Sequence, residues 1–436
     1  MRVLKFGGTS VGSAERMKAL VSLVTDETPK IVVLSAMSGT TNSLVEIANA
    51  LYDKKHDAAA TLIDTVKKKY FAVVKELYSK QTAIDIANGL IESHFNYLSS
   101  FTMDMFTVNE ERAILAQGEL LSTAMFHYYL EEIGIESVLL PALNFMRIDE
   151  NEEPDLIYTE AHIKKELASH STCKLFITQG YICRNTFGEI DNLKRGGSDY
   201  TATIIGAAIQ ADEIQIWTDI DGMHNNDPRV VDKTHPIAEL SFDEAAELAY
   251  FGAKILHPTC ILPAKQKNIP VRLLNTMQPE AKGTVISATS SGDSIKAVAA
   301  KDGITSINIQ SGRMLLAYGF LRAVFEVFER YKTPIDMITT SEVAVSVTID
   351  NTKNVDVILK ELQEFGKVVI DKDLTIVCIV GNFTGEKQGY ALKVFESLKN
   401  IPIKMISYGG SEHNISILVE SKYKKDALIA LNKGLF

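Results

Sequence analysis

Six short apolar runs in the first 280 residues constrain the fold more than any other feature of the sequence. They are RVLKF, KIVVLSA, SVLLPA, KLFITQGYI, EIQIWTDI and PVRLLN. Their near-continuous hydrophobicity is typical of strands buried on both faces, as in a parallel sheet covered by helices. Helical patterns separate the runs, including a long helical stretch from about residue 43 to 132. We therefore expect an α/β domain at 1–280 with a helical insertion.

The sequence changes character after this region. Residues 278–294 are rich in small and polar side chains, and we place a linker at 281–294. Short β-branched runs follow, and the order strand, helix, strand, strand, helix, strand can be read about twice. This order indicates two small α+β modules within the regulatory region 295–436. We expect one module at about 311–385, and the other at 295–310 together with 386–436.

Composition excludes several classes of protein. The chain has 45 basic and 55 acidic residues and a net charge of -10, which argues against a general binder of nucleic acid or anionic membranes. No stretch approaches the roughly 18 apolar residues of a membrane span, and no signal peptide is visible, so we expect a cytoplasmic protein. The four cysteines lack CxxC spacing, so we expect neither a zinc site nor a redox pair.

Glycines and hydroxyl-bearing residues gather at the predicted strand ends, where open α/β sheets bind ligands. They occur at 7–10, at 35–42, in RGGSD at 195–199, and at 218–219 with DPR at 227–229. A single glycine pair favours a tight turn, but four such ends in one sheet favour an anion site, because glycine lets backbone N–H groups converge on a phosphate. Lys5 adds a positive charge. The Walker, protein-kinase and dinucleotide signatures are absent.

Two charged residues favour an amino-acid substrate. Arg195 offers a planar fork that fits a carboxylate. Glu119, in QGELLS, is either a solvated charge on a helix face or the partner of an ammonium group. A site with both a fork and an acid would suit an α-amino acid zwitterion.

The motifs resemble those of the aspartokinase family, in the same order along the chain. They are KFGGTSVGS, VVLSAMSGTTN, QGELLS, LKRGGSDYTA, IWTDIDGMHNNDPRVV and FGAKILHP. The stretch GFLRAVFEVFERYKTPIDMITTSEVAVSVTID resembles the regulatory ACT region of the lysine-sensitive, monofunctional type. The resemblance covers nearly the whole chain. It implies a three-layer αβα, carbamate kinase-like amino-acid kinase domain followed by two ferredoxin-like ACT domains.

The resemblance also implies an activity. The reaction would be ATP + L-aspartate → ADP + 4-phospho-L-aspartate, with Mg²⁺ bridging the phosphates and no covalent enzyme intermediate. This is the first step of the aspartate pathway to lysine, threonine and methionine. Because ACT modules commonly pair across subunits, we expect a homodimer or a dimer of dimers.

Roles for individual residues follow from matching the family's motifs. Lys5 and Asp199 would be catalytic, with Asp199 orienting Lys5. The aspartate pocket would contain Ser35, Thr41, Glu119, Arg195 and Ser198. The nucleotide would lie against Lys5, Phe6, Gly7, Gly8, Thr218, Asp219, His224, Arg229 and Lys254, with His224 standing where the family often has tyrosine.

The effector pattern departs more from the family. The residues that would line the effector site are Met314, Ala317, Phe320, Leu321, Asp336, Ser341 and Glu342, and no metal ligand is expected. Asp336 would face the ammonium of the effector. Ala317 stands where a serine is usual, and Pro334 replaces a serine near Asp336. Lysine inhibition is therefore expected to be weaker, altered or absent, and threonine or another amino acid stays open as the effector.

Two alternatives remain. One is a related acyl-phosphate kinase acting on glutamate, against which the KFGGTSV start and the ACT pair argue. The other is a catalytically silent amino-acid sensor, against which the intact Lys5, Arg195 and Asp199 argue.

Overall fold

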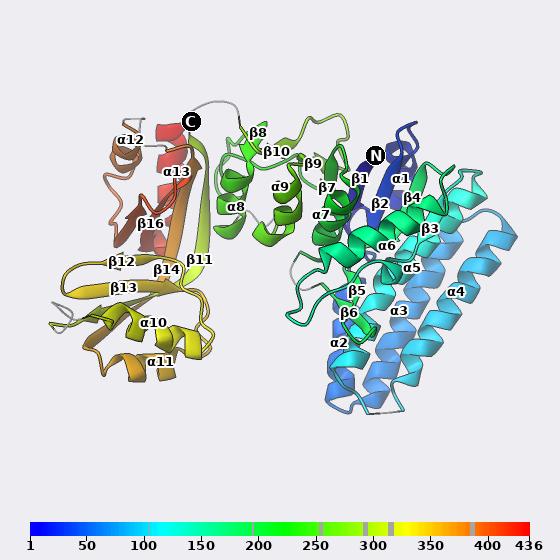
Figure 1. The fold of residues 1–436 in the computed structure, drawn as a ribbon, viewed down its shortest axis with the longest axis horizontal. Helices are drawn as coiled ribbons and strands as arrows, with labels where there is room; N and C mark the ends of the chain where they lie inside the picture. Colours follow the sequence, from blue (N-terminus) through cyan, green and yellow to red (C-terminus); the bar gives the residue numbers. More distant parts are fainter. Residues whose placement is uncertain (104, 194–195, 253–255, 291–294, 313–317, 384–388) are drawn as a thin grey trace. The chain divides into compact units, whose positions relative to one another are not determined.

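The chain divides into two compact units in the computed structural model, which describes residues 1–103, 105–193, 196–252, 256–290, 295–312, 318–383 and 389–436 (Figure 1). The first unit is Met1–Met223 with Leu256–Ser290, and the second is His224–Ile255 with Ser291–Phe436. Residues 224–255 thus fold with the C-terminal part of the chain. Our expected boundaries, with a catalytic domain at 1–280, follow the chain in order and stay a prediction.

The six apolar runs form six neighbouring strands of the first unit, as predicted. They are β1 (Arg2–Phe6), β2 (Lys30–Leu34), β3 (Val138–Leu140), β4 (Leu175–Gln179), β7 (Ile214–Thr218) and β9 (Val271–Asn275). The strands lie in the order β3-β4-β2-β1-β7-β9, and every pair is parallel. Strand β10 (Thr284–Ser287) adds an antiparallel partner to β9. The carboxyl ends of β1, β2, β4 and β7 consequently meet at one edge of the sheet.

Helices cover both faces of this sheet. The helices are α1 (Ala14–Val24), α2 (Thr40–Tyr52), α3 (His56–Leu77), α4 (Gln81–Ser100), α5 (Val108–Glu132), α6 (Leu156–Ala168), α7 (Gly197–Ile209) and α9 (Leu262–Lys267). Leu4 and Phe6 of β1 share a core with side chains of α1 to α5. Val3, which points to the other face, is also fully buried, and α7 packs against β1. The predicted helical stretch appears in Figure 1 as the long helices α2 to α5.

Capping residues explain where two of the helices begin. Thr107 and Glu110 form a capping box at the start of α5, and the Ser13 side chain accepts from the backbone of Arg16 at the start of α1. A short hairpin, β5 (Ile182–Arg184) with β6 (Ile190–Asn192), follows β4. Two 3-10 turns, Ala142–Asn144 and Pro258–Ile261, complete the first unit.

The second unit contains a sheet with strand order β12-β13-β11-β14-β16-β15. The helices and strands of the second unit, in chain order, are β8 (Glu239–Ser241), α8 (Phe242–Tyr250), β11 (Ile295–Gln310), α10 (Phe320–Arg330), β12 (Ile338–Thr340), β13 (Ala344–Ile349), α11 (Val355–Leu362), β14 (Lys367–Gly381), α12 (Tyr390–Ser397), β15 (Met405–Tyr408), β16 (Asn414–Glu420), the 3-10 turn Ser421–Tyr423 and α13 (Lys424–Leu435). Two separate cores stabilise it, one under α10 and α11 and one under α12 and α13.

The two ferredoxin-like folds share their long central strands, which differs from our expected division at 311–385 and 295–310 with 386–436. Residues 305–310 of β11 pair with β13 in the first fold, whereas 295–301 pair with the part of β14 that faces β16. The β11–β14 register shifts between Lys301 and Ile304 and again before Ser306. The expected division joined 295–310 with 386–436, whereas β11 and β14 each take part in both folds, and its bounds stay a prediction.

Two expectations from composition can be compared with the described residues. Among the helices described here, none is long and apolar enough to span a membrane. All four cysteines are buried and carry free thiols.

Candidate active site

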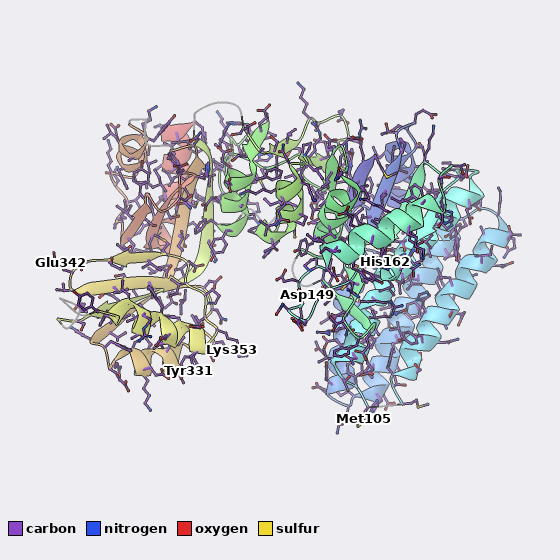
Figure 2. The ribbon with its side chains drawn as sticks, in the orientation of Figure 1. Met105, Asp149, His162, Tyr331, Glu342 and Lys353 are labelled. Atoms are coloured by element: carbon purple, nitrogen blue, oxygen red, sulfur yellow. The ribbon has the colours of Figure 1, made fainter. Side chains whose placement is uncertain are left out.

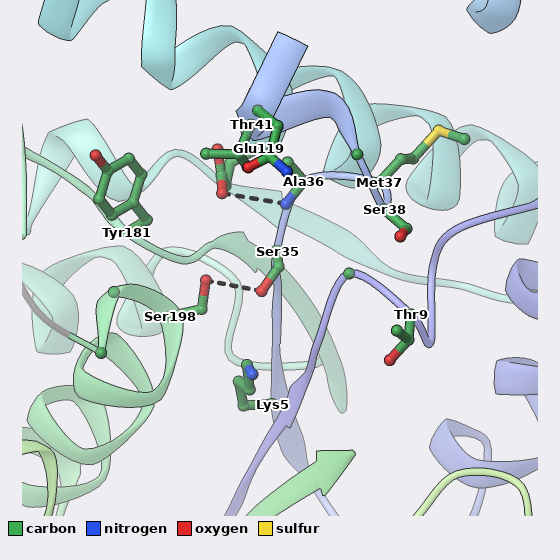
Figure 3. Close-up of a pocket in the computed structure, with 15 residues that line it drawn as sticks. Lys5, Thr9, Ser35, Ala36, Met37, Ser38, Thr41, Glu119, Tyr181 and Ser198 are labelled. Carbon is green, nitrogen blue, oxygen red and sulfur yellow. Dashed lines mark hydrogen bonds between the residues drawn. The ribbon is translucent and has the colours of Figure 1, made fainter. Parts of the chain in front are cut away.

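Residues from three of the four predicted strand ends line one pocket in the first unit (Figure 3). Its volume is about 460 Å³. The lining residues are Lys5, Gly8, Thr9, Ser35, Ala36, Met37, Ser38, Gly39, Thr41, Asn42, Glu119, Tyr181, Gly196, Gly197 and Ser198. Residues almost 200 positions apart in sequence thus meet where β1 and β2 end. The location agrees with the rule that open α/β sheets bind ligands beyond the carboxyl ends of their strands.

Lys5 and Asp199 form an ion pair at this pocket. The Lys5 Nζ atom lies 2.7 Å from Asp199 Oδ1, and their side chains are only 12% and 15% exposed. Asp199 stands in the first turn of α7, so the pair joins the sheet to a helix N-terminus. The contact fixes the Lys5 ammonium in place, as expected for a positive group that Asp199 orients.

Two helices present their N-termini to the pocket. Helix α2 begins after Gly39 and α7 after Gly196, and both glycines have left-handed backbone conformations, with φ of 79° and 75°. Glycine adopts this conformation without the strain that a Cβ would add. Because the first N–H groups of a helix lack partners within the helix, two such ends facing one space favour a negatively charged ligand.

Glu119 is a buried carboxylate with one unsatisfied oxygen. It is 3% exposed on α5, and its Oε1 accepts a hydrogen bond of 3.1 Å from the backbone N–H of Ala36. The other oxygen, Oε2, has no hydrogen-bond partner. Burial raises the pKa of Glu119 to about 7. The solvated helix-face alternative is therefore wrong, and the carboxylate is placed to receive a donor from a ligand.

The hydroxyl-bearing residues Ser35, Thr41 and Ser198 line the pocket together with Glu119. The Ser35 hydroxyl donates to Ser198 Oγ at 2.9 Å, and the Ser122 hydroxyl donates to the backbone oxygen of Ser35 at 2.7 Å. Thr41 lies in the first turn of α2. Three of the side chains predicted for an aspartate pocket are thus brought together with Glu119, while Arg195 lies outside the described residues.

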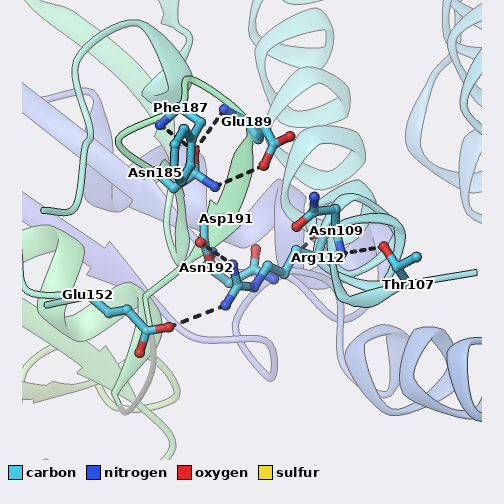
Figure 4. Close-up of polar contacts among 9 residues, drawn as sticks. All are labelled: Thr107, Asn109, Arg112, Glu152, Asn185, Phe187, Glu189, Asp191 and Asn192. Atoms are coloured by element: carbon cyan, nitrogen blue, oxygen red, sulfur yellow. Dashed lines mark hydrogen bonds and ion pairs between the residues drawn. The ribbon is translucent and has the colours of Figure 1, made fainter. Parts of the chain in front are cut away.

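Tyr181 is a pocket residue that the sequence analysis missed. Its φ of 68° is unusual for a side chain other than glycine, and its backbone N–H donates to Thr201 Oγ1 at 2.9 Å. It lines the main pocket and also a second cavity of about 190 Å³, which Arg112, Asp191 and Asn192 line as well. Figure 4 shows these three residues and their polar contacts. Tyr181 lies in the run KLFITQGYI, two residues after the end of β4, so the strand-end rule could have identified it.

The nucleotide candidates of the first unit lie at or just after the carboxyl ends of β1 and β7. Thr218, at the end of β7, donates to Asp219 Oδ1 at 3.1 Å. Phe6 is fully buried and stacks on Trp217 with ring centroids 5.7 Å apart, so its side chain belongs to the core rather than to a binding surface. Gly7 donates its backbone N–H to the Trp217 oxygen at 3.4 Å, and Gly8 lines the pocket.

The remaining nucleotide candidates belong to the second unit or lie outside the described residues. The Arg229 guanidinium donates two hydrogen bonds to the Asp227 carboxylate, with Nε–Oδ1 and Nη2–Oδ2 distances of 2.9 Å. The His224 Nδ1 lies 2.9 Å from Thr234 Oγ1. Lys254 lies outside the described residues. The roles of these residues stay predictions.

The effector candidates are spread over the first ACT-like fold. Phe320 packs edge-on against Phe365 with ring centroids 6.1 Å apart, and Leu321 is 38% exposed. Ser341 and Glu342 are exposed between β12 and β13, where Figure 2 labels Glu342. Asp336 is buried. Met314 and Ala317 lie outside the described residues.

Comparisons with known proteins cover the whole chain. The amino acid kinase family matches residues 1–275, and an ACT domain matches residues 377–435. Lysine-sensitive aspartokinase 3 of Escherichia coli strain K12 is 33% identical over 447 residues, spanning 100% of this chain and 99% of that protein. The chloroplastic aspartokinase 3 of Arabidopsis thaliana is 35% identical over 465 residues, spanning 100% of this chain and 81% of that protein.

Solved structures agree with these matches. E. coli aspartokinase III in complex with aspartate and ADP has a TM-score of 0.86 at 32% identity, with 100% of both chains covered. The complex of E. coli aspartokinase III with lysine and aspartate has a TM-score of 0.81 at 32% identity, covering 100% of this chain and 99% of that one.

Glu119→Gln is expected to stabilise the protein above pH 7. The folded-state pKa of this acid is raised from 4.5 to about 7, so the folded protein loses stability as the pH rises through this window. Removing the charge should raise the free energy of unfolding by on the order of 3 kcal/mol at pH 8 and by much less at pH 5. Thermal melting at both pH values measures this difference.

A matched control is Glu132→Gln in the same helix. The Glu132 Oε1 accepts hydrogen bonds from the backbone N–H groups of Ser79 and Lys80 at 2.8 and 2.5 Å, so this substitution should destabilise. A Glu119→Gln protein that melts below the unsubstituted protein at pH 8, or shows the same difference at both pH values, would contradict the burial argument.

Proposed function

The chain belongs to the aspartokinase family. On this basis we propose that the residues of its 460 Å³ pocket catalyse the transfer of the γ-phosphoryl group of ATP to the side-chain carboxylate of L-aspartate. The products are ADP and 4-phospho-L-aspartate. As a member of this family the chain is an aspartate kinase with an ACT regulatory region. The observation that carries the proposal is the meeting of an oriented cation, two helix N-termini and an unsatisfied buried carboxylate in one pocket.

Lys5 acts on the transferring phosphoryl group. Phosphoryl transfer depends mainly on positioning and on neutralising the charge of the phosphoryl oxygens. The Lys5 ammonium is held by Asp199, so it needs little reorganisation when ATP binds. Because the carboxylate of aspartate is already ionised at neutral pH, it attacks directly and needs no general base.

The substrate is oriented by charges at the opposite side of the pocket. The aspartate ammonium donates to the free Oε2 of Glu119, which stabilises the ionised form of Glu119. Ser35, Thr41 and Ser198 supply hydroxyl contacts, and Arg195 clamps the α-carboxylate. The side-chain carboxylate is then left free to face Lys5.

The nucleotide extends from Lys5, Gly7 and Gly8 to Thr218 and Asp219, with His224, Arg229 and Lys254 as further contacts. Arg229 has to exchange part of its contact with Asp227 for a phosphate. No group of three or more metal-ligating side chains occurs within the described ranges. Mg²⁺ would therefore be held mainly by phosphate oxygens, where it neutralises charge, as is usual for this ion.

Regulation and assembly belong to the same proposal. An amino-acid end product, with lysine as the first candidate, inhibits through the ACT region. The subunits assemble as a homodimer or dimer of dimers in the cytoplasm. Strand β12 supports assembly through the second unit, because it is an edge strand whose three residues are all exposed.

The wild-type assay is ATP-dependent hydroxamate formation with aspartate or glutamate. Aspartate-dependent product supports the proposal. Product with glutamate alone would favour the related acyl-phosphate kinase, and lysine binding without turnover of either substrate would favour the silent sensor.

Lys5→Met is expected to lower kcat about 100- to 1000-fold while KM for aspartate stays within a fewfold, because the lost charge acts on the phosphoryl group. Steady-state kinetics measure both constants. The control is Lys174→Met, which removes the Lys174–Glu27 pair of 2.9 Å before the amino end of β4. Near-normal turnover of Lys5→Met would remove Lys5 from the mechanism.

Arg195→Ala is expected to raise KM for aspartate about 10- to 100-fold, since hydrogen bonds to charged groups contribute about 1.5–3 kcal/mol. Arg184→Ala serves as control, because Arg184 donates to the backbone oxygen of Leu143 at 3.0 Å and does not line the pocket. An unchanged KM in Arg195→Ala would exclude the carboxylate clamp.

A further inference from the structure

Asp336, the carboxylate expected to face the effector's ammonium, already binds an ammonium group of this chain. The Lys301 Nζ atom lies 2.6 Å from Asp336 Oδ1, and the Asp336 side chain is only 1% exposed. The Tyr250 hydroxyl donates to the same oxygen at 2.8 Å. The other oxygen, Oδ2, is buried without a hydrogen-bond partner. A free ligand therefore has no solvent-exposed oxygen of Asp336 to bind.

Lys301 is held there by more than one contact. Its Nζ lies 4.4 Å from the centre of the Tyr250 ring, a cation–π distance. Burial alone would lower the pKa of Lys301, but the hydrogen bonds to Asp336 and Asp350 outweigh burial and raise the pKa. The side chain is thus charged at neutral pH, like the ammonium of free lysine.

Asp350 gives Lys301 a second position. Its Oδ2 lies 2.9 Å from Lys301 Nζ, and its side chain is 41% exposed. Lys301 therefore stands between a buried and an exposed carboxylate. If another ammonium took Asp336, Lys301 could keep its ion pair with Asp350 and move toward solvent. The exchange would leave every charge paired, which limits its cost.

We propose that Lys301 is a tethered competitor for the effector's ammonium at Asp336, so that free lysine inhibits this enzyme only by displacing it. Any effector that binds Asp336 through an ammonium group has to displace Lys301 first. The inference rests on the proposed function, because it takes Asp336 as the effector carboxylate.

Helix α8 is the element that would respond to displacement. Tyr250, its last residue, contacts both Lys301 and Asp336. Glu247, one turn earlier, accepts hydrogen bonds from Ser411 and Asn414 of the second ACT-like fold, at 2.9 and 2.5 Å. The chain continues from Tyr250 to Lys254, a predicted nucleotide contact. Tyr250, which contacts Asp336, is therefore four residues along the chain from this predicted nucleotide contact.

The test compares lysine inhibition of the wild-type protein and Lys301→Met in the full-length enzyme. Lys301→Met is expected to lower the lysine concentration for half-inhibition at least tenfold, or to create inhibition if the wild type shows none. Adding Asp336→Asn to Lys301→Met should abolish the gain. Sensitivity that is unchanged or reduced in Lys301→Met would overturn the proposal.

A binding measurement separates this inference from the proposed activity. Lysine should raise the melting temperature of Lys301→Met more than that of the wild type, whether or not aspartate is phosphorylated. Equal shifts would contradict the proposal even in an active enzyme. Absent kinase activity with a larger shift would instead contradict only the proposed function.

Two further variants serve as a second substitution at Lys301 and as a matched control. Lys301→Gln removes the ammonium but keeps a donor for Asp336, so it should fold if Lys301→Met does not, and it is expected to show the same gain. Lys404→Met is the matched control, because Lys404 also bridges two carboxylates, Asp371 and Glu420, in the same unit. A similar gain in Lys404→Met would show that the effect is not specific to Asp336.

Discussion

The ion pair between Lys5 and Asp199 is the interaction on which the catalytic pocket depends. It joins β1, at the centre of the parallel sheet, to the first turn of α7, which follows it by almost 200 residues. The pair fixes the cation at the N-terminus of α7, and the N-terminus of α2 lines the same pocket. Glu119 supplies the negative end, and its pKa near 7 shows that the pocket holds this charge at a cost in stability. Opposite charges at the two ends suit a zwitterion whose side-chain carboxylate must meet a phosphate.

Much of this site could be predicted because strand patterns and strand ends are local features. The six apolar runs became six neighbouring parallel strands, and glycines and hydroxyls from three of the four predicted strand ends line one pocket. The burial of Glu119 could not be predicted, since one turn of QGELLS does not show which face of α5 meets the sheet. Tyr181 was missed although it lies two residues after β4, because the glycines of RGGSD give the stronger signal for an anion site. Phe6 was assigned to the nucleotide, but strand alternation turns it into the core against Trp217.

In the second unit, the order of segments along the chain does not predict which segments pack together. Strands β11 and β14 each serve two folds, so no sequence boundary separates the ACT-like modules. Tyr250, Lys301 and Asp336 come from distant segments and form one cluster that no motif contains. Helix α8 begins with a capping box, yet only the structure shows that it packs against β11 and β14. The segment that leads to a predicted nucleotide contact is thereby part of the regulatory unit.

The central claim is that the pocket directs a carboxylate oxygen of aspartate onto the γ-phosphorus of ATP. Aspartate labelled with ¹⁸O in its side-chain carboxylate tests this directly, with hydroxylamine used to trap the product at its carbonyl carbon. Direct attack leaves one labelled oxygen between carbon and phosphorus, so the inorganic phosphate released by hydroxylamine should carry one ¹⁸O. Unlabelled phosphate would show that the phosphoryl group never bonds to the aspartate carboxylate, and it would contradict the account.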